Sequence, residues 1–364
     1  MLEEIKNNLE LSLSNYINNL DKTYQLSKIS PLLHQSIKNF ISRKGKRLRP
    51  LLFCLSYLGY SKKPAKGLYE SALALELTHN FLLIHDDIID KSDLRRGEPS
   101  MHEMMNNFLK GYKPDGDGAP SVSQNISQSR QNIKFSGDDL AIVIGDIIYA
   151  LAVNLFLTID EKKARKEKAA KKFSEIVIYT GAGQFIELLY GAQNLSRIKK
   201  EDIYKIYDLK TAYYSFSYPL SLGAVLAGEE EKELRKLFEY GRCLGRAFQI
   251  KDDILNLFAP EKETGKPALT DLKEAKKTIL LQLTYQKLNP KNRSRINKTL
   301  SKKHLDSLDL TSLREIISES GSLKSAEQEI SCYLDKAKKI SASLKMRPRY
   351  KNLIESYTAE LLKV

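Results

Sequence analysis

The amino-acid sequence predicts an all-α protein with a single domain. Apolar residues recur mainly at spacings of three and four, with charged residues between them, which is the period of an amphipathic helix. Strand-like alternation is scarce along the chain. The 364 residues are 42% hydrophobic, enough for a large core. We find no repeat of fixed period and no domain boundary within residues 1–364.

The N-terminal part of the chain predicts helices separated by short breaks. Residues 1–42 have the pattern of one or two amphipathic helices. Pro50 follows a basic cluster, and the apolar run Leu51–Tyr60 continues as a helix. Residues 66–90 predict a long helix that ends in an acidic cluster. Residues 110–137 are rich in Gly, Pro, Asp, Ser, Gln and Asn, so they predict a long polar insertion loop.

The run Leu140–Leu157 is the most apolar window of the chain and approaches the length of a membrane span. Asp146 lies near its middle, where a carboxylate is costly in lipid. We therefore expect a buried helix of a soluble bundle and no transmembrane segment. The charge run Glu161–Lys172 predicts a solvated helix face.

Helical periodicity continues into the C-terminal half, over residues 173–195, 201–227 and 230–258. Residues 259–275 contain Pro and Gly among charged residues and predict a loop. Residues 276–364 are again helical, with Gly321 as the expected break.

The formal net charge of +14 favours anionic ligands such as nucleic acid, acidic membrane surfaces or polyphosphate metabolites, although a basic surface without a partner is equally compatible. Cys54, Cys243 and Cys332 are widely spaced, which disfavours a disulfide framework or a zinc site. The N-terminus Met1–Lys6 lacks a secretory apolar region. We therefore expect a cytoplasmic protein.

An acidic motif, DDIID, occupies Asp86–Asp90 at the end of an apolar helical stretch. Asp86 and Asp90 are four residues apart, so they share one helix face and repel each other unless a cation lies between them. Mg²⁺ prefers oxygen ligands and commonly takes one or two carboxylates together with substrate phosphates. The alternative is an acidic helix end whose charge Arg95 and Arg96 neutralise.

Two further groups of residues support a site for magnesium and a diphosphate. The pair Asp252 and Asp253 repeats the acidic motif within a second apolar helical stretch. Lys46 and Arg49 are three residues apart, so they can face one ligand, where Arg binds phosphate oxygens through a planar fork and Lys acts as a point charge. The alternative is a basic turn that contacts solvent or nucleic acid, although no aromatic residues interleave with these cations.

Together these motifs resemble the trans-type polyprenyl diphosphate synthases, prenyltransferases that extend an allylic diphosphate with isopentenyl diphosphate. The pattern is closest to the archaeal-type short-chain geranylgeranyl diphosphate synthases. Matching segments follow the family's order over roughly residues 40–280: Gly45–Pro50, His79, Asp86–Asp90, Leu94–Gly97, Gly145–Asp146, Gly183–Gln184, Lys210–Thr211, Phe248–Asp253, Gly265–Lys266 and Lys276–Thr278.

The resemblance implies an isoprenoid synthase-type helical bundle around a deep central cavity, a homodimer, and no nucleic-acid partner. It implies that isopentenyl diphosphate is bound by Lys46, Arg49, His79 and Arg96. It implies that the allylic diphosphate is bound by Arg95, Lys210, Lys266 and Lys276. It implies that three Mg²⁺ ions are held by Asp86, Asp90, Asp252 and, from its place in the motif, Asp87. For His79, a satisfied core histidine is the alternative.

The resemblance also implies that Lys210, Thr211 and Gln249 are catalytic, with Thr211 and Gln249 placing negative dipole ends near an allylic cation that is protected from water. Two features depart from the family. Asn256 stands where the fullest second motif has Asp, and we expect altered metal affinity from it. The loop at residues 110–137 is longer than usual, and we interpret it as a tolerated insertion.

Product length should depend on the helix that carries Asp86. Phe81 lies five residues before Asp86, about 7.5 Å along the axis, and Leu82 lies four before it. With the deeper Thr78, these residues would form the floor for the growing hydrocarbon. An aromatic residue at this position resembles the geranylgeranyl diphosphate synthases, so we expect that product first, farnesyl diphosphate second and longer products third. Core packing is the alternative role of Phe81.

Other functions fit the sequence less well. A class I terpene cyclase would not need the second diphosphate site formed by Lys46, Arg49 and His79, and the same holds for a head-to-head squalene or phytoene synthase. A non-catalytic regulatory subunit of a heteromeric synthase should lose parts of the acidic motifs, and only Asn256 points that way. A nucleic-acid or membrane-surface protein leaves the acidic motifs unexplained.

Overall fold

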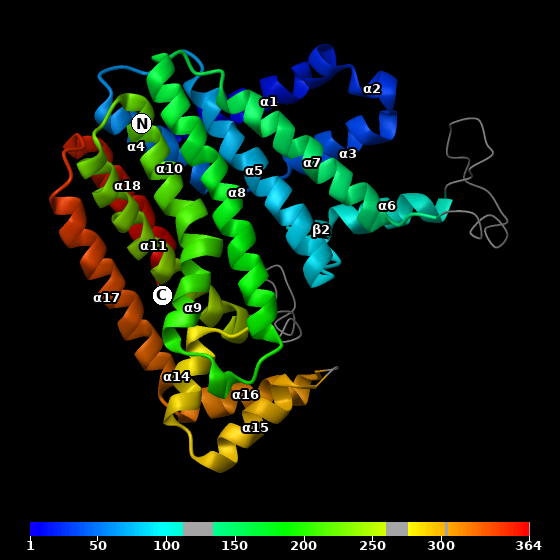
Figure 1. The fold of residues 1–364 in the computed structure, drawn as a ribbon, viewed down its shortest axis with the longest axis vertical. Coiled ribbons are helices and arrows are strands. Elements are labelled where there is room, and N and C mark those ends of the chain that lie inside the picture. Colours follow the sequence, from blue (N-terminus) through cyan, green and yellow to red (C-terminus); the bar gives the residue numbers. More distant parts are fainter. Residues whose placement is uncertain (112–133, 260–275, 303–304, 364) are drawn as a thin grey trace.

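Helices form nearly every element of the computed structural model, which describes residues 1–111, 134–259, 276–302 and 305–363 (Figure 1). The N-terminal half contains α1 Leu2–Tyr24, α2 Leu26–Ile29, α3 Pro31–Ser42, α4 Leu48–Tyr60, α5 Leu68–Asp90, β1 Leu94–Arg95, β2 Glu98–Pro99, α6 Met101–Gly111 and α7 Gly137–Phe156.

The second half continues with α8 Lys163–Gly191, the 3₁₀-helix η2 Leu195–Arg197, α9 Lys200–Tyr207, the π-helix η3 Asp208–Ser217, α10 Tyr218–Ala227 and α11 Glu231–Phe258. The C-terminal part contains α14 Ile279–Lys287, α15 Pro290–Leu300, α16 Ser307–Glu319, α17 Ser322–Ala342 and α18 Pro348–Leu362. The all-α prediction is therefore confirmed.

Local sequence explains where several helices begin. Ser30 caps α3 by accepting a hydrogen bond from the Leu33 amide, and Pro31 occupies the first turn. Ser136 and Asp139 form a capping box at the start of α7. Gly321, the expected break, adopts a positive φ of 66° directly before α17, a conformation that glycine adopts without strain.

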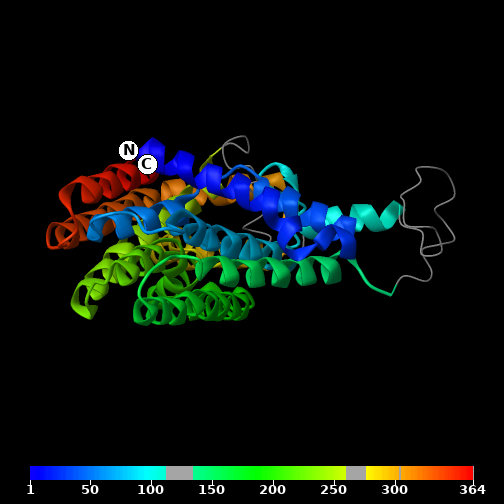
Figure 2. The same ribbon diagram turned by 90° about the horizontal axis from the view of Figure 1, so that it is seen from above.

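The long helices α5 and α7 pack side by side in the upper part of the molecule as Figure 1 shows it. In Figure 2, α7 and α8 lie along one side of the molecule, and α1, α17 and α18 lie along the opposite side. One contiguous cluster of buried apolar side chains extends from Ile5 in α1 to Leu362 in α18. This core holds in place the helices from which the functional side chains project.

Helix α7 differs in part from the expectation. Within the described ranges it is the one helix whose length and composition would allow it to cross a membrane, and 44% of its apolar window is buried. Its buried side, with Ile144 and Ile148, packs against the core, but Ile142 and Val143 are exposed. The expectation of a buried helix is therefore correct for one side only, because the apolar sequence continues around the helix.

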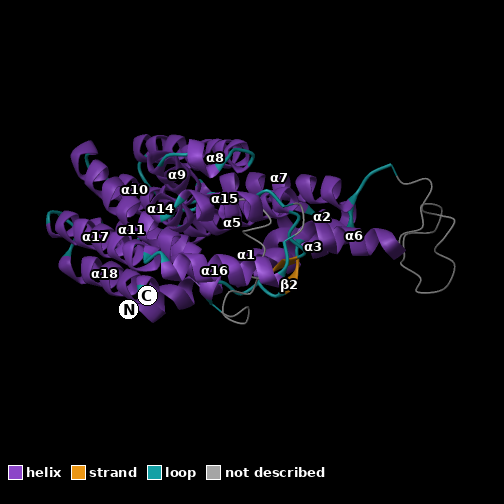
Figure 3. Cartoon of the chain, turned by 90° about the horizontal axis from the view of Figure 1, so that it is seen from below, coloured by secondary structure: helices purple, strands orange, loops and turns teal. Residues whose placement is uncertain are grey.

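Two short elements were not expected from the sequence. The pattern at 201–227 predicts a continuous helix, whereas the structure has α9, the π-helix η3 and α10 in succession. Strands β1 and β2 form a small hairpin after α5, the one sheet in the described part of the chain (Figure 3). Most of the polar loop predicted at 110–137 and of the loop predicted at 259–275, including Lys266, lies outside the described residues.

Candidate active site

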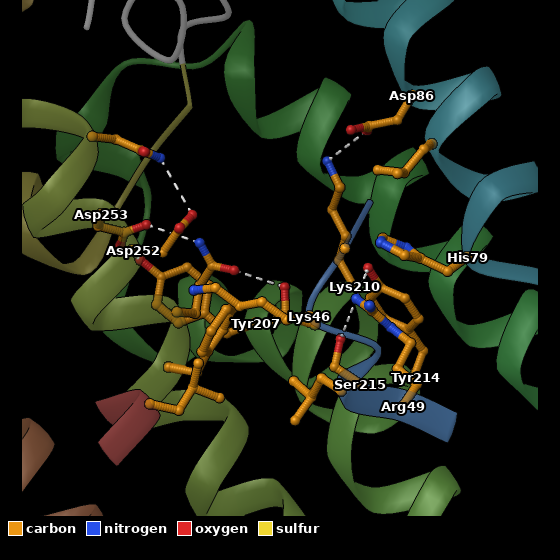
Figure 4. Close-up of a pocket in the computed structure, with 18 of the residues that line it drawn as sticks. Lys46, Arg49, His79, Asp86, Tyr207, Lys210, Tyr214, Ser215, Asp252 and Asp253 are labelled. Atoms are coloured by element: carbon orange, nitrogen blue, oxygen red, sulfur yellow. Dashed lines mark hydrogen bonds and ion pairs between the residues drawn. The ribbon is translucent and has the colours of Figure 1, made fainter. Parts of the chain in front are cut away.

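A cavity of about 550 Å³ opens between α4, α5, η3, α11 and the segment that precedes α14 (Figure 4). It brings together most of the site residues predicted from sequence: Lys46, Arg49, His79, Asp86, Arg95, Arg96, Lys210, Thr211, Gln249, Asp252 and Lys276. Five other predicted residues do not line it: Thr78, Phe81, Leu82, Asp87 and Asp90.

Lys210 connects two carboxylates in this cavity. Its Nζ lies 3.2 Å from Asp86 Oδ1 and 2.5 Å from Glu187 Oε2. Burial alone would lower the pKa of Lys210, but the charges of Asp86 and Glu187 outweigh burial and raise it. The ammonium is therefore charged and held beside the first acidic motif. Glu187 on α8 was not expected from the sequence, which offers no motif that points to it.

Asp90 lies beside Lys276, whose Nζ is 3.3 Å from Asp90 Oδ2. Burial and the neighbouring charge of Asp86 raise the pKa of Asp90. Burial would also raise the pKa of Asp86, but Lys210 and Lys276 reverse this and lower it. One turn of α5 thus carries two carboxylates whose repulsion the nearby lysines only partly offset.

This arrangement fits a divalent cation. Within the described ranges, no group of three or more His, Cys, Asp or Glu side chains forms a ready-made metal cage. Mg²⁺ does not require one, because it keeps several waters and is usually bound through one or two carboxylates plus substrate phosphates. The repulsion between Asp86 and Asp90 is the feature that such a cation would relieve.

Asp252 stands across the cavity from Asp86 (Figure 4). Asn256, one turn further along α11, donates from Nδ2 to Asp252 Oδ2 at 3.3 Å. The two acidic motifs, more than 160 residues apart in the sequence, therefore face one space. The residue that departs from the family pattern orients the carboxylate that the pattern makes a metal ligand.

Asp87, predicted as a metal ligand from its place in the motif, contacts an arginine in the structure, and its role in metal binding stays a prediction. Its carboxylate is fully buried and binds the Arg95 guanidinium, with Nε 2.8 Å from Oδ1 and 3.1 Å from Oδ2. On a helix, adjacent residues point about 100° apart, so Asp87 turns away from the face that Asp86 shares with the cavity. Asp87 instead holds Arg95, which does line the cavity.

The hairpin after α5 aims Arg95 and Arg96. Arg96 and Gly97 have φ of 58° and 77°, as a two-residue turn of the primed type requires, and such a φ is uncommon for arginine. Arg96 Nη2 lies 3.5 Å from Glu76 Oε1. Arg43 stabilises the other strand through a contact of 3.2 Å with Glu98. The positive φ of Arg96 thus belongs to a turn that places the Arg96 side chain at the wall of the cavity.

Arg47 adds a cation to the part of the cavity lined by Lys46, Arg49, His79 and Arg96, which we call the cationic end. Neither Arg47 nor its partner Glu76 was assigned a role from the sequence. Glu76 is buried and accepts from Arg47 Nη1 at 2.7 Å. Helical spacing could have revealed Glu76, because it lies three residues before His79 on the same face of α5.

Arg49 and His79 meet at Tyr214. Arg49 Nη2 donates to Tyr214 Oη at 2.6 Å and to Ser215 Oγ at 2.8 Å. Burial and the charge of Arg49 hold the pKa of His79 well below its usual value, so the imidazole is neutral. Its buried Nδ1 has no hydrogen-bond partner among the described residues. His79 also lines the cavity, and its role in binding isopentenyl diphosphate stays a prediction.

The π-helix η3 carries Lys210 and Thr211, and its surroundings explain how this rare winding is held. Gly183 of α8 packs so closely that an added Cβ would lie 2.9 Å from the Lys210 amide nitrogen. At the first residue of η3, the buried Asp208 accepts two bonds of 2.6 Å from Arg246. Such a bidentate pair combines strength with a defined geometry.

Thr211, Gln249, Asp253 and Tyr207 form a continuous hydrogen-bond chain. Thr211 Oγ1 donates to Gln249 Oε1 at 2.7 Å, and Gln249 Nε2 donates to Asp253 Oδ1 at 3.0 Å. Tyr207 Oη donates to Asp253 Oδ2 and accepts from the Ile279 amide at 2.8 Å. Thr211 and Gln249 were predicted as site residues from the sequence, whereas Tyr207 was given no role there and Asp253 was named only as part of the second acidic motif.

The residues predicted as a product floor lie in the packed interior. Phe81 is buried and stacks on Tyr149 of α7, with ring centroids 5.0 Å apart. Thr78 donates to the Ala74 carbonyl at 2.8 Å. Leu83, which was not predicted, lines the cavity from the same helix. The contacts of Phe81 are those of a core residue, and its role in product length stays a prediction.

Fold and site thus define an all-α protein with two acidic motifs and a cationic end around one cavity. A family model described as "Polyprenyl synthetase" matches residues 30–317. A geranylgeranyl diphosphate synthase from Sulfolobus acidocaldarius is 32% identical over 306 residues, 83% of this chain and 82% of that protein. A geranylfarnesyl diphosphate synthase from Aeropyrum pernix is 31% identical over 83% of this chain and 84% of that protein.

The fold is shared with solved structures. A geranylgeranyl pyrophosphate synthase from Corynebacterium glutamicum, complexed with isoprenyl diphosphate and magnesium, superposes with a TM-score of 0.85 at 22% identity, over 100% of this chain and 99% of that chain. The chain belongs to the polyprenyl synthetase family. Its enzymatic class is that of a prenyltransferase.

Proposed function

We propose that this protein is a magnesium-dependent trans-prenyltransferase that condenses isopentenyl diphosphate with allylic diphosphates, head to tail, and that geranylgeranyl diphosphate is its main product. The observation that carries the proposal is that Asp86 and Asp252 face each other across a cavity whose other end holds Arg49 and a neutral His79. The cavity can therefore hold the allylic diphosphate at its acidic end and isopentenyl diphosphate at its cationic end at the same time.

The carboxylate end would hold the allylic substrate. Asp86, Asp90 and Asp252 would hold magnesium together with the allylic diphosphate, and three ions are expected. When bound, magnesium supplies Lewis-acid neutralisation of the leaving diphosphate. Lys210 is charged and already placed beside Asp86, and Arg95 and Lys276 lie nearby, so these cations stabilise the developing negative charge. Lys266 is proposed for the same diphosphate from its motif alone.

The cationic end would bind isopentenyl diphosphate through Lys46, Arg49, His79 and Arg96. Neutral His79 can donate one hydrogen bond without competing for the carboxylates, and Arg49 can bind phosphate oxygens with its planar fork. The bond between the allylic carbon and its diphosphate breaks, and the double bond of isopentenyl diphosphate attacks that carbon. A proton then leaves, accepted by the departed diphosphate. Thr211 and Gln249 line the cavity where the intermediate cation would form.

Product length is proposed from two sources. Similar proteins make both geranylgeranyl and geranylfarnesyl diphosphate, by their names. Phe81, with Leu82 and Thr78 on the same helix, is our candidate for the floor that stops elongation. Its ring lies between α5 and α7, next to Tyr149.

We also infer a homodimer that uses α7 and α8. Large apolar side chains are exposed on these neighbouring helices: Ile142, Val143, Val153, Ile178, Phe185, Leu188 and Leu189. Phe185 is 65% exposed. An apolar surface of this kind on a soluble protein marks an interaction site.

A single domain and a cytoplasmic location are further proposals. The contiguous core supports the single domain. The three cysteines, all within the described residues, form no disulfide, which supports the cytoplasmic location.

The test is to incubate the purified protein with Mg²⁺, labelled isopentenyl diphosphate, and dimethylallyl, geranyl or farnesyl diphosphate in turn. The dephosphorylated products are then sized. A dominant geranylgeranyl product supports the proposal in full. Farnesyl or longer products keep the reaction and remove the assignment of product length. A folded protein that elongates no primer would overturn the proposal in favour of a regulatory subunit or a cyclase.

A further inference from the structure

The hydrogen-bond chain that begins at Thr211 has a direction, and its buried end sets that direction. Asp253 and Tyr207 are both buried, being 4% and 5% exposed. Asp253 accepts from Gln249 on one oxygen and from Tyr207 on the other. The Gln249 amide nitrogen can only donate, and the Tyr207 phenol, which accepts from the Ile279 amide, has its own proton left for Asp253. Both neighbours therefore present donors to Asp253.

The orientation of Gln249 follows. Its Nε2 must point to Asp253, so its carbonyl oxygen Oε1 must point to Thr211. An amide oxygen only accepts, so the Thr211 hydroxyl is the donor in the 2.7 Å contact. With its proton directed at Gln249, the Thr211 oxygen has lone pairs that remain for other contacts. Thr211 lines the cavity, so these lone pairs are available there.

Tyr207 reinforces this direction from the other side of Asp253. The Ile279 amide donates to Tyr207 Oη at 2.8 Å, so the phenol accepts from the backbone and turns its own proton toward Asp253. Burial, together with the charge of Asp253, raises the pKa of Tyr207, and the phenol remains protonated. The backbone at the start of α14 thus orients a chain that ends in the cavity.

We propose that Asp253 and Tyr207 are positioning residues that direct the Thr211 hydroxyl so that oxygen lone pairs, and not a proton, face the cation that forms on the allylic carbon. This inference rests on the proposed function. The negative end of a fixed dipole stabilises a developing positive charge without reorganisation, whereas a reversed hydroxyl would oppose it. Neither residue needs to touch the substrate.

The substitution Asp253→Asn tests the direction while it preserves shape. The introduced amide can accept from Tyr207 on its oxygen and donate from its nitrogen. Gln249 would then rotate, accept from that nitrogen and donate to Thr211, so the Thr211 proton would turn into the cavity. We expect kcat to fall on the order of tenfold or more at saturating Mg²⁺ and substrates. We expect both KM values and the melting temperature to change little.

A compensating variant separates direction from mere structure. The double variant combines Asp253→Asn with Gln249→Glu, which moves the carboxylate one step along the chain and keeps the total charge. The moved carboxylate accepts from both the introduced amide and the Thr211 hydroxyl, which restores the original direction. We expect most of the lost kcat to return. In a Thr211→Val background there is no hydroxyl to orient, so Asp253→Asn should have almost no further effect on kcat.

Several results would overturn the proposal. An equal loss in the Thr211→Val background, or no recovery in the double variant, would show that Asp253 acts by another route. A raised Mg²⁺ requirement in Asp253→Asn would make Asp253 a metal ligand. If Asp253→Asn folds poorly, Tyr207→Phe offers the same comparison in both backgrounds, with a smaller loss expected. Inactivity of the unsubstituted enzyme would instead be a failure of the proposed function.

Discussion

The Arg95 guanidinium binds the fully buried carboxylate of Asp87, although Asp87 belongs to the acidic motif that is expected to bind metal. Residues of the same motif, within one helical turn, therefore have different contacts. Asp86 and Asp90 share one side of α5, and Asp87 holds a cation at the cavity wall.

These different contacts predict different effects of removing each charge. Asp87→Asn should raise the KM of the allylic diphosphate about tenfold, because one charge-assisted bond to Arg95 is weakened. The Mg²⁺ dependence of this variant should match that of the unsubstituted protein. Asp86→Asn should lower kcat by roughly a thousandfold and shift the Mg²⁺ dependence. Steady-state kinetics over a Mg²⁺ titration measure both, and a shifted Mg²⁺ dependence in Asp87→Asn would make Asp87 a metal ligand.

Phe81→Ala should lengthen the product. Removing the ring that stacks on Tyr149 opens space between α5 and α7 in the proposed path of the hydrocarbon. The control is Phe173→Ala, which removes another buried ring, one that stacks on Phe156 at 4.4 Å, and should leave the product unchanged. Chromatography of the dephosphorylated products distinguishes them. If both variants give the product of the unsubstituted protein, Phe81 is a core residue only.

Phe185→Glu should separate the proposed dimer into monomers. A charge placed within the exposed apolar surface of α8 would have to be buried without a partner in the interface. Leu308→Glu is the matched control, since Leu308 is 76% exposed on α16, which lies on the opposite side of the molecule from α7 and α8 in Figure 3. Light scattering after gel filtration gives the mass of each variant. Dimers that persist in Phe185→Glu would place the interface elsewhere.

The neutral His79 predicts a pH-dependent loss of stability. Its pKa is held well below 6.5 in the folded protein, whereas the unfolded chain takes up a proton near that value. The unfolded state therefore binds more protons below pH 6.5, and stability falls as pH falls. His79→Gln should remove about 1 kcal/mol of this loss per pH unit. Urea unfolding at about pH 7.5 and about pH 5.5 measures it, and parallel losses in both proteins would mean that His79 is charged when folded.

Much of the site could be predicted because short-range spacing carries its chemistry. The period of α5 places His79 and Asp86 on one face, and both line the cavity. The basic residues before α4 likewise lie at its wall, as their position in the sequence indicates. Glu187 carries no such signal, because it lies on α8 and reaches Lys210 of η3 only through packing.

The sequence by itself determined that the chain is helical, that two acidic motifs and a basic turn work together, and that they belong to diphosphate chemistry. Each motif consists of residues within a few helical turns of one another, and the order of the motifs along the chain is that of the family. Only the tertiary structure decided that Asp87 holds Arg95, that Lys210 lies on a π-helix, and which way the Thr211 hydroxyl points. The physical reason is that buried charges and hydrogen-bond donors must find partners, and packing brings those partners from distant parts of the chain.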